Sequence, residues 1–256
     1  MTWLEAVILG LIQGLTEFLP ISSSGHLVLA QHFMDIHETG VFLEVILHMG
    51  TLAAILIYYR DDLKQLAMDV YNGEDQAKAY FLYLIVATLP AFCAGFLLDE
   101  YIVSTFIPST VIWMLVITGV IVGSTYFVNN RSNKEFSYTI ILLIGFAQAF
   151  SLLPGISRSG ITISFALLMG INHREAAKFA FFMAIPALLG AALFQMDKIN
   201  NIEQFSLFPL ILGFSSAFVV GYLVIDWLLA VILKGKFYLF SLYCFTIVII
   251  SYILIN

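Results

Sequence analysis

Six long apolar runs, separated by polar segments, constrain the fold of this chain more than any other feature. They cover residues 41–60, 79–98, 109–128, 176–196, 208–233 and 237–255, and each carries few charged side chains. Runs of roughly 20 apolar residues predict helices that cross the ~30 Å hydrocarbon core of a bilayer. Since 61% of the residues are apolar and only 11% are charged, we expect an all-α polytopic integral membrane protein.

Two other apolar regions are too short and too polar to span in the same way. Residues 3–34 are interrupted at Pro20 and by the run Ser22-Ser23-Ser24-Gly25-His26, and residues 138–170 are interrupted at Pro154-Gly155. Polar groups at membrane depth are stable only when they are buried in protein or line a wet cavity. We therefore predict that each region forms a re-entrant helix–loop–helix hairpin.

This order of elements occurs twice along the chain. A hairpin followed by three spans makes up residues 1–128 and again residues 138–256. At an offset of 135 residues, Gly10, Gln13, Ile21, Ser22, Ser24 and Gly25 match Gly145, Gln148, Ile156, Ser157, Ser159 and Gly160. Because three spans separate the hairpins, they enter from opposite faces. This is the pattern of an inverted-topology repeat whose broken helices meet near the membrane midplane.

Basic residues lie mainly on one side of the predicted topology. That side holds Arg60, Lys64, Lys78, Arg131, Lys134, Arg174, Lys178, Lys234 and Lys236, and the other side holds Lys198. Since basic loops stay in the cytoplasm, both termini and the mouth of the first hairpin are predicted to face outward. The charged segments 61–78 and 99–108 are expected to be loops. The net charge of −6 argues against a nucleic-acid partner.

The first hairpin carries an acidic and an amide side chain on one helix face. Gln13 and Glu17 are four residues apart, which brings them together on a helix. Carboxylate and carboxamide oxygens suit a hard divalent cation, Mg²⁺ or Ca²⁺, and a glutamate here also suits a general base. The alternative is a buried glutamate that is satisfied by hydrogen bonds.

The serine run that follows precedes a helix beginning near His26. Backbone N–H groups at a helix start bind anions, and Gly25 allows a phosphate to approach the backbone closely. His26, three residues after Ser23, could activate the serine hydroxyl or protonate a leaving group. A plain N-cap is the alternative interpretation of the serine run Ser22-Ser23-Ser24.

The second hairpin has Arg158 where the first has Ser23. A planar guanidinium binds phosphate through two hydrogen bonds and stays charged. An anion site would be completed by Gly155, Ser157, Ser159 and Thr162. The alternative is a structural ion pair between Arg158 and Glu17. If the site is functional, Ser23, Glu17 and His26 should lie close enough to Arg158 for one bound phosphate to contact all of them.

Three further polar residues lie within the apolar runs. Glu44 and His48 are four residues apart and so share a helix face. They are either a supporting or metal-binding pair, or an interior pair that satisfies itself. Asp226 lies in another apolar run and has no assigned role.

Together these motifs resemble the undecaprenyl-diphosphatases of the bacitracin-resistance type. That family has an (E/Q)xxxE motif, here Gln13 to Glu17, and a Ser-Ser-(Ser/Thr)-Gly-His run, here Ser22 to His26. Its third motif, PGxSRSxxT, corresponds to Pro154 to Thr162. The similarity covers essentially the whole chain. Each motif is weak alone, whereas the combination is specific.

The resemblance implies a membrane enzyme that hydrolyses undecaprenyl diphosphate to undecaprenyl phosphate and inorganic phosphate. The product is the lipid carrier for cell-wall precursors, and family members confer bacitracin resistance because the drug sequesters the diphosphate. It further implies dependence on a divalent cation and a site that opens to the outer face of the bacterial cytoplasmic membrane. A homodimer is compatible with this interpretation.

Two functions therefore compete at the sequence level. In a phosphatase, Ser23 attacks with His26 as base or acid, or His26 activates water, while Arg158 holds the phosphates. A lipid-phosphate transporter or flippase would use the same midplane anion site without needing a hydroxyl and an imidazole. Phosphate release by purified protein in detergent distinguishes them.

Overall fold

The computed structural model describes residues 2–36, 40–128, 133–196 and 206–255, and within these ranges all regular structure is helical. The helices are α1 (Trp3–Phe18), α2 (Ser23–Phe33), α3 (Gly40–Tyr58), α4 (Arg60–Tyr71), α5 (Asp75–Leu97), α6 (Asp99–Ser104), α7 (Pro108–Ser124), α8 (Tyr138–Phe150), α9 (Arg158–Leu168), α10 (His173–Met196), α11 (Leu207–Leu233) and α12 (Phe240–Ile255). Short 3₁₀ turns cover Thr125–Phe127 and Phe237–Leu239. Arg131 and Lys198, which the topology prediction uses, lie outside the described residues.

Five of the described helices, α5, α7, α10, α11 and α12, are long and apolar enough to cross a membrane. A sixth span results when α3 is counted together with α4, from which it is bent by 70°. The six apolar runs of the sequence coincide with α3 and with these five helices, whereas α4 lies beyond the first run. The chain is thus an all-helical polytopic membrane protein.

The expectation of loops at residues 61–78 and 99–108 is wrong in both places. Helix α4 follows α3 after a sharp bend, and α6 fills most of the second segment. In α4, Asp61 and Asp62 occupy the first turn, where carboxylates stabilise a helix start, and no residue of the helix is buried. A search for apolar runs misses such polar helices because it detects only those that are apolar throughout.

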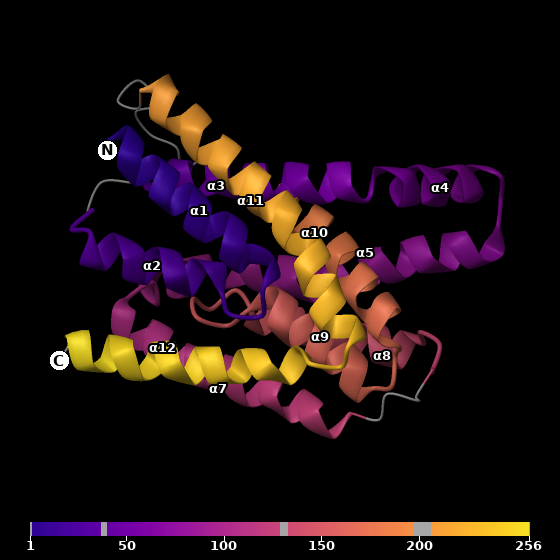
Figure 1. The fold of residues 1–256 in the computed structure, drawn as a ribbon. Coiled ribbons are helices and arrows are strands. Elements are labelled where there is room, and N and C mark those ends of the chain that lie inside the picture. The colour runs from indigo at the N-terminus through magenta and orange to yellow at the C-terminus, as the bar shows by residue number, and fades with distance from the viewer. Residues whose placement is uncertain (1, 37–39, 129–132, 197–205, 256) are drawn as a thin grey trace.

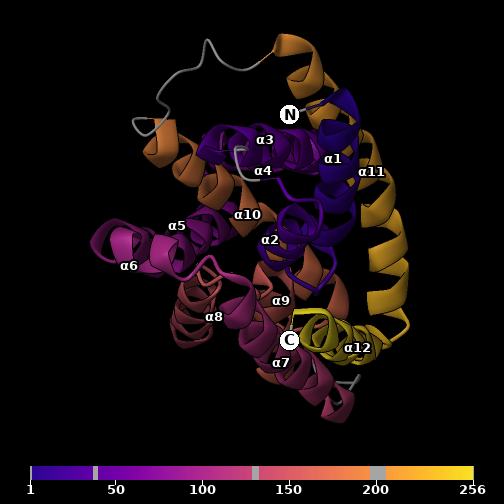
Figure 2. The same cartoon turned by 90° about the vertical axis from the view of Figure 1, so that its left-hand side faces the viewer.

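Each region predicted to form a hairpin consists of two short helices joined by a turn, and its re-entrant course through a membrane stays a prediction. Helix α1 ends at Phe18, two residues before Pro20, and α2 begins after the N-cap Ser22. Helices α8 and α9 are joined in the same way through Pro154-Gly155, with Ser157 as the N-cap. The view of Figure 2 places α2 and α9 near the middle of the molecule, with the other helices around them, and Figure 1 shows α2 to the left of α9.

The turns of the two hairpins are bonded directly to each other. The Gly155 N–H donates to Ser22 Oγ at 3.2 Å, and the Ser159 hydroxyl donates to the Leu19 carbonyl at 3.0 Å. A Cβ atom on Gly25 would lie only 3.0 Å from the Gly155 Cα, so the two backbones nearly touch. The two turns, which are far apart in sequence, therefore contact each other where the site lies.

Glycines set how each hairpin meets a neighbouring span. A Cβ on Gly10 would lie 2.4 Å from the Gly213 carbonyl oxygen, so α1 packs closely on α11. A Cβ on Gly145 would lie 2.7 Å from the Ala87 carbonyl oxygen, so α8 packs closely on α5. Each hairpin thus packs on a span of the other half of the chain. The inverted relation between the halves stays a prediction.

An aromatic cluster fixes the end of α1 against α3 and α10. Phe18 packs edge-on to Phe181 at 5.7 Å between ring centroids, and Tyr59 packs edge-on to Phe182 at 5.5 Å. Phe18, Phe181 and Phe182 are almost completely buried. Because Glu17 directly precedes Phe18, this packing also holds the carboxylate in place.

Candidate functional site

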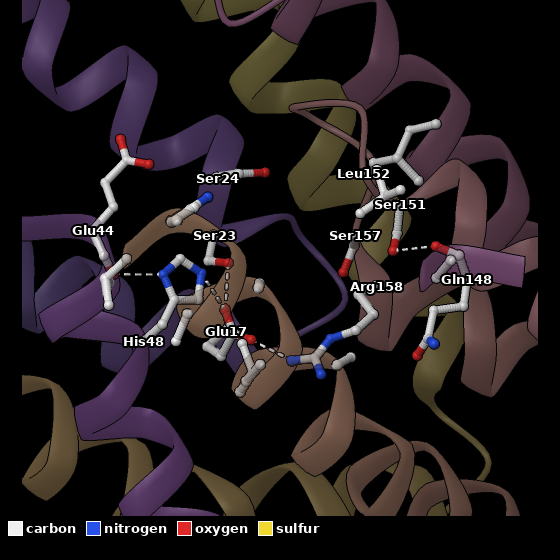
Figure 3. Close-up of a pocket in the computed structure, with 18 of the residues that line it drawn as sticks. Glu17, Ser23, Ser24, Glu44, His48, Gln148, Ser151, Leu152, Ser157 and Arg158 are labelled. Carbon is white, nitrogen blue, oxygen red and sulfur yellow. Dashed lines mark hydrogen bonds and ion pairs between the residues drawn. The ribbon is translucent and has the colours of Figure 1, made fainter. Parts of the chain in front are cut away.

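A cavity of about 190 Å³ lies where the two hairpins meet. It is polar on the side of the turns, and Figure 3 shows the labelled side chains converging on it. Its polar lining consists of Glu17, Ser23, Ser24, Glu44, His48, Gln148, Ser151, Ser157, Arg158 and Gln195. The cavity is several times larger than the ~30 Å³ that one water occupies in the liquid. It therefore has room for a ligand.

Glu17 is the centre of the site and joins the two hairpins. Its side chain is only 4% exposed, and Arg158 Nη2 donates to its Oε1 atom. The other oxygen, Oε2, accepts hydrogen bonds from Ser23 Oγ at 2.5 Å and from Gln13 Nε2 at 3.0 Å. The structure thus brings Glu17, Ser23 and Arg158 together, as the sequence predicts.

The ion pair occupies only half of the Arg158 guanidinium. Among the described residues, the buried Nη1 atom of Arg158 has no hydrogen-bond partner, and the side chain lines the cavity. A guanidinium with one free edge can bind a phosphate oxygen while it neutralises Glu17. The structural ion pair and the anion site are therefore compatible.

His26 does not line the cavity. Its Nδ1 atom lies 2.7 Å from the Ser22 carbonyl oxygen, and its Nε2 atom lies 3.0 Å from the Tyr243 hydroxyl. The ring also stacks on Tyr243, with 5.7 Å between centroids. In this arrangement both ring nitrogens are engaged away from Ser23, and the imidazole supports the turn and docks α2 on α12.

His48 is the imidazole that lines the cavity. Its Nδ1 atom donates to the carbonyl oxygen of Glu44, one turn back on α3, at 2.7 Å. This bond directs Nε2 towards Glu17 Oε2, 3.7 Å away (Figure 3). The spacing of Glu44 and His48 was the only sequence signal for this role, because an apolar helix gives no sign of which face meets α1.

The remaining residues of the predicted anion site mostly hold the turns. Ser22 Oγ accepts from the N–H groups of Gly25 and Gly155, both at 3.2 Å. Ser159 is bonded to the Leu19 carbonyl, and the Thr162 hydroxyl donates to the Arg158 carbonyl at 2.8 Å. Five residues of the predicted set do not line the cavity, namely Ser22, Gly25, Gly155, Ser159 and Thr162.

Ser24 and Ser157 are the two hydroxyls of that predicted set that line the cavity. Gly155 has φ of +100°, and a Cβ there would lie 2.6 Å from the Val111 carbonyl oxygen. Glycine is therefore required for the shape of the second turn rather than for direct contact with a ligand.

Gln13 and Glu17, the predicted cation ligands, are adjacent and almost fully buried. Gln13 Oε1 has no partner among the described residues, while Glu17 is held by Arg158, Ser23 and Gln13 itself. Within the described part of the chain there is no cluster of three or more His, Cys, Asp or Glu side chains that could hold a metal. Carboxylate and carboxamide oxygens are of the type that Mg²⁺ and Ca²⁺ prefer, and these two side chains alone supply fewer ligands than either ion takes.

A second cavity of about 370 Å³ opens beside the polar one between α5, α6 and α10. It is lined mainly by apolar residues such as Phe92, Phe96 and Phe194. The two cavities share part of their lining, namely Glu44, Ala91, Phe106, Leu152, Ala187, Ala191 and Gln195. A ligand with a charged head and a long apolar tail fits this pair of cavities.

The polar residues of the spans have separate places. Glu44 lines both cavities and its Oε1 atom lies 3.4 Å from the Gln31 amide nitrogen. Asp226 lies away from the site and accepts a hydrogen bond of 2.5 Å from Tyr58.

Comparison with known proteins gives a consistent result over almost the full length. Residues 6–250 match the family described as "Bacitracin resistance protein BacA". An undecaprenyl-diphosphatase of Syntrophotalea carbinolica is 39% identical over 254 residues, which cover 95% of both chains. Undecaprenyl-diphosphatase 1 of Shouchella clausii is 35% identical over 267 residues, covering 99% of this chain and 96% of the relative. An undecaprenyl-diphosphatase of Bacteroides thetaiotaomicron is 34% identical over 252 residues, covering 95% and 96%.

Proposed function

The chain belongs to the bacitracin resistance protein BacA family, and from this premise we propose that it hydrolyses undecaprenyl diphosphate to undecaprenyl phosphate and inorganic phosphate. The observation that carries the proposal is the contact of Ser23, Glu17 and Arg158 in a cavity that shares part of its lining with an apolar one. A nucleophile, a base and a phosphate-binding cation are thus combined with space for a lipid. This reaction recycles the carrier lipid and removes the diphosphate that bacitracin sequesters.

Ser23 is the nucleophile in this proposal. Its hydroxyl donates to Glu17 Oε2 at 2.5 Å, so the proton can pass to the carboxylate as Oγ bonds to the terminal phosphorus. The bridging P–O bond breaks, and the prenyl phosphate leaves with the bridging oxygen. Water then attacks the phosphoserine, which releases inorganic phosphate and restores Ser23.

The charges of the reaction are held by residues of both hairpins. Arg158 binds the phosphate through Nη1 while Nη2 stays on Glu17. His48 Nε2, 3.7 Å from Glu17 Oε2, helps to keep that oxygen directed towards Ser23. Direct attack by water is the alternative to a phosphoserine, and substitution of Ser23 distinguishes the two.

A divalent cation, Mg²⁺ or Ca²⁺, would be held by Glu17 and Gln13, with their buried oxygens as ligands. Such an ion supplies positive charge that stabilises the transferred phosphate. The prenyl chain lies in the apolar cavity between α5, α6 and α10.

We place the site towards the outer face of the bacterial cytoplasmic membrane, with both termini outside. The excess of basic residues on one side of the topology supports this orientation. Helix α1 begins and α12 ends at the end of the molecule opposite to α4, which carries Arg60 and Lys64 (Figure 1).

Release of inorganic phosphate from undecaprenyl diphosphate by the purified protein in detergent micelles tests the proposal. Steady turnover that depends on Mg²⁺ or Ca²⁺ is the expected result. The rival function, transport of a lipid phosphate, draws on the two broken hairpins that meet at the centre of the fold. Micelles allow no transport, so a protein that binds the lipid without releasing phosphate would favour the transporter.

A further inference from the structure

We propose that Gln148, together with the free edge of Arg158, binds the phosphate that stays on the prenyl product. This inference rests on the proposed function and assigns the inner phosphate of the substrate to its own subsite. Gln148 lies on α8, in the second hairpin, at the position that corresponds to Gln13 in the first.

The amide of Gln148 is buried in the wall of the cavity without a partner. The residue is 1% exposed, and neither its Oε1 nor its Nε2 atom has a hydrogen-bond partner among the described residues. Its backbone carbonyl accepts from the Ser151 hydroxyl at 2.6 Å, which fixes the end of α8. Leaving a buried amide unpaired is costly, so this side chain is suited to a ligand in the cavity.

Comparison with Gln13 explains why the Gln148 amide is left for a ligand. Gln13 Nε2 donates to Glu17, four residues later on the same helix face. Four residues after Gln148 stands Leu152, which offers no acceptor. The second hairpin thus keeps the amide of the first but replaces its internal partner by an apolar side chain.

A second donor faces the same cavity. Arg158 Nη2 is engaged by Glu17, whereas Nη1 has no partner within the described part of the chain. Both Gln148 and Arg158 line the cavity, and Figure 3 shows Arg158 between Gln148 on one side and Glu17 with Ser23 on the other. An amide N–H and a guanidinium edge together form a site for an anion.

The position of the apolar cavity decides which phosphate binds there. Leu152, four residues after Gln148, is one of the seven residues that line both cavities, so Gln148 lies on the same hairpin as part of their shared boundary. When the terminal phosphate lies at Ser23 and the chain lies in the apolar cavity, the inner phosphate falls between them. As the bridging P–O bond breaks, its electron pair stays on the oxygen that leaves with this inner phosphate. Donors from Gln148 and Arg158 would stabilise that charge.

Product inhibition separates the two phosphate subsites. The variant Gln148→Met removes the amide but keeps an unbranched side chain of similar length. We expect the inhibition constant of undecaprenyl phosphate and the KM for undecaprenyl diphosphate to rise roughly tenfold to a hundredfold, the effect of losing a hydrogen bond to a charged group. The inhibition constant of inorganic phosphate, which reports the terminal subsite, should stay within about twofold of the wild type.

Gln148→Glu is a second variant that places a negative charge at the same position. It should weaken the binding of undecaprenyl phosphate further, which is measured as a still higher inhibition constant. Gln65→Leu is the matched control, since Gln65 lies on α4 and donates to Asp69 far from the cavity. The inference is overturned if inhibition by undecaprenyl phosphate is unchanged in both variants, or if inhibition by inorganic phosphate weakens as much. A wild-type protein that releases no phosphate would contradict the proposed function instead.

Discussion

In the first hairpin, Ser22 caps α2 by accepting from the Gly25 N–H at 3.2 Å, and in the second, Ser157 caps α9 by accepting from the Gly160 N–H at 3.1 Å. Both turns therefore end in a serine N-cap, and they are hydrogen-bonded to each other. They differ in the side chain that follows the cap, which is Ser23 in one hairpin and Arg158 in the other.

A second difference lies one helix earlier, where Glu17 of the first hairpin corresponds to Leu152 of the second. The first hairpin therefore supplies the nucleophile and the carboxylate, and the second supplies the cation and a free amide. One scaffold used twice can build an asymmetric site when only two or three side chains differ. The following predictions test whether the chemistry is divided in this way.

The largest effect is expected at Ser23, which we propose as the nucleophile of the first hairpin. Ser23→Ala removes the attacking oxygen but leaves the Glu17–Arg158 pair in place. We expect kcat for undecaprenyl diphosphate to fall by about 10⁴-fold or more, as for other nucleophile deletions. Phosphate release under single-turnover conditions measures the loss.

Ser216→Ala is a suitable control, because the Ser216 hydroxyl donates to a carbonyl of its own helix, α11, at 2.7 Å. Its activity should equal that of the wild type. If Ser23→Ala keeps even a tenth of the wild-type rate, water is the attacking group. The first hairpin would then not supply the nucleophile, and the two hairpins would differ less in their chemical roles.

Arg158→Lys tests the second hairpin while keeping its positive charge. Lysine cannot hold Glu17 with one nitrogen and a phosphate with another, because its donors do not form a planar fork. We expect kcat/KM to fall by about 10²- to 10³-fold. Lys178→Ala is the matched control, since it breaks an exposed ion pair with Asp62 outside the cavity and should cost less than ~1 kcal/mol of stability.

If Arg158→Lys keeps full kcat/KM, the free guanidinium edge has no role in phosphate binding. Thermal unfolding of both variants in detergent shows whether lost activity reflects a lost fold. Glu17 is nearly fully buried, so Arg158→Ala, which leaves its charge unpaired, is expected to unfold more easily than Arg158→Lys.

The two histidines provide the third test, because sequence and structure rank them differently. His48 lines the cavity and lies beside Glu17, whereas His26 bonds to Ser22 and Tyr243. We expect His48→Gln to lower kcat roughly tenfold to a hundredfold with little change in thermal stability, through looser positioning of Glu17. His26→Gln should chiefly lower the thermal stability of the fold.

Equal effects of the two substitutions on kcat would contradict this ranking. Activity measured with saturating lipid, together with melting curves of both variants, decides it. His32→Gln provides a background control, since His32 is exposed and lies outside the cavity.

Much of the site could be predicted from the sequence, because a few residues carry strong local signals. Pro20 and Pro154-Gly155 break apolar regions at fixed positions, and the charged side chains nearby must be buried together. The meeting of Glu17, Ser23 and Arg158 follows from these signals. The order of apolar runs and breaks along the chain also predicted the two helix–turn–helix regions and the approximate bounds of the spans.

Other features depend on contacts that the sequence does not display. His48 reaches the cavity because of the way α3 packs on α1, and an apolar helix has no periodicity that shows its contact face. His26 turns away because its ring nitrogens find partners in Ser22 and Tyr243, which is 217 residues distant. The apolar cavity likewise depends on the packing of α5 and α6 against α10, which is distant from them in sequence.

The smallest effect is expected at Thr118, which supports only the second turn. Its hydroxyl donates to the Gly155 carbonyl at 2.8 Å and accepts from the Ser157 N–H at 3.1 Å, so α7 holds the turn that carries Arg158. Thr118→Val keeps the side-chain shape but removes both bonds and leaves two buried backbone groups unpaired. We expect a loss of about 1–3 kcal/mol in stability, seen as a lower melting temperature in detergent.

The effect of Thr118→Val on catalysis sharpens the comparison of the hairpins. Because Thr118 does not touch the first turn directly, Ser23 and Glu17 should keep their hydrogen bond, while Arg158 becomes less well placed. KM should therefore rise several-fold with a smaller change in kcat, since the second hairpin binds phosphate and the first performs the attack. A fall in kcat with unchanged KM would show that the two turns act as one rigid unit. The two hairpins would then carry different side chains without having separate roles in phosphate binding and attack.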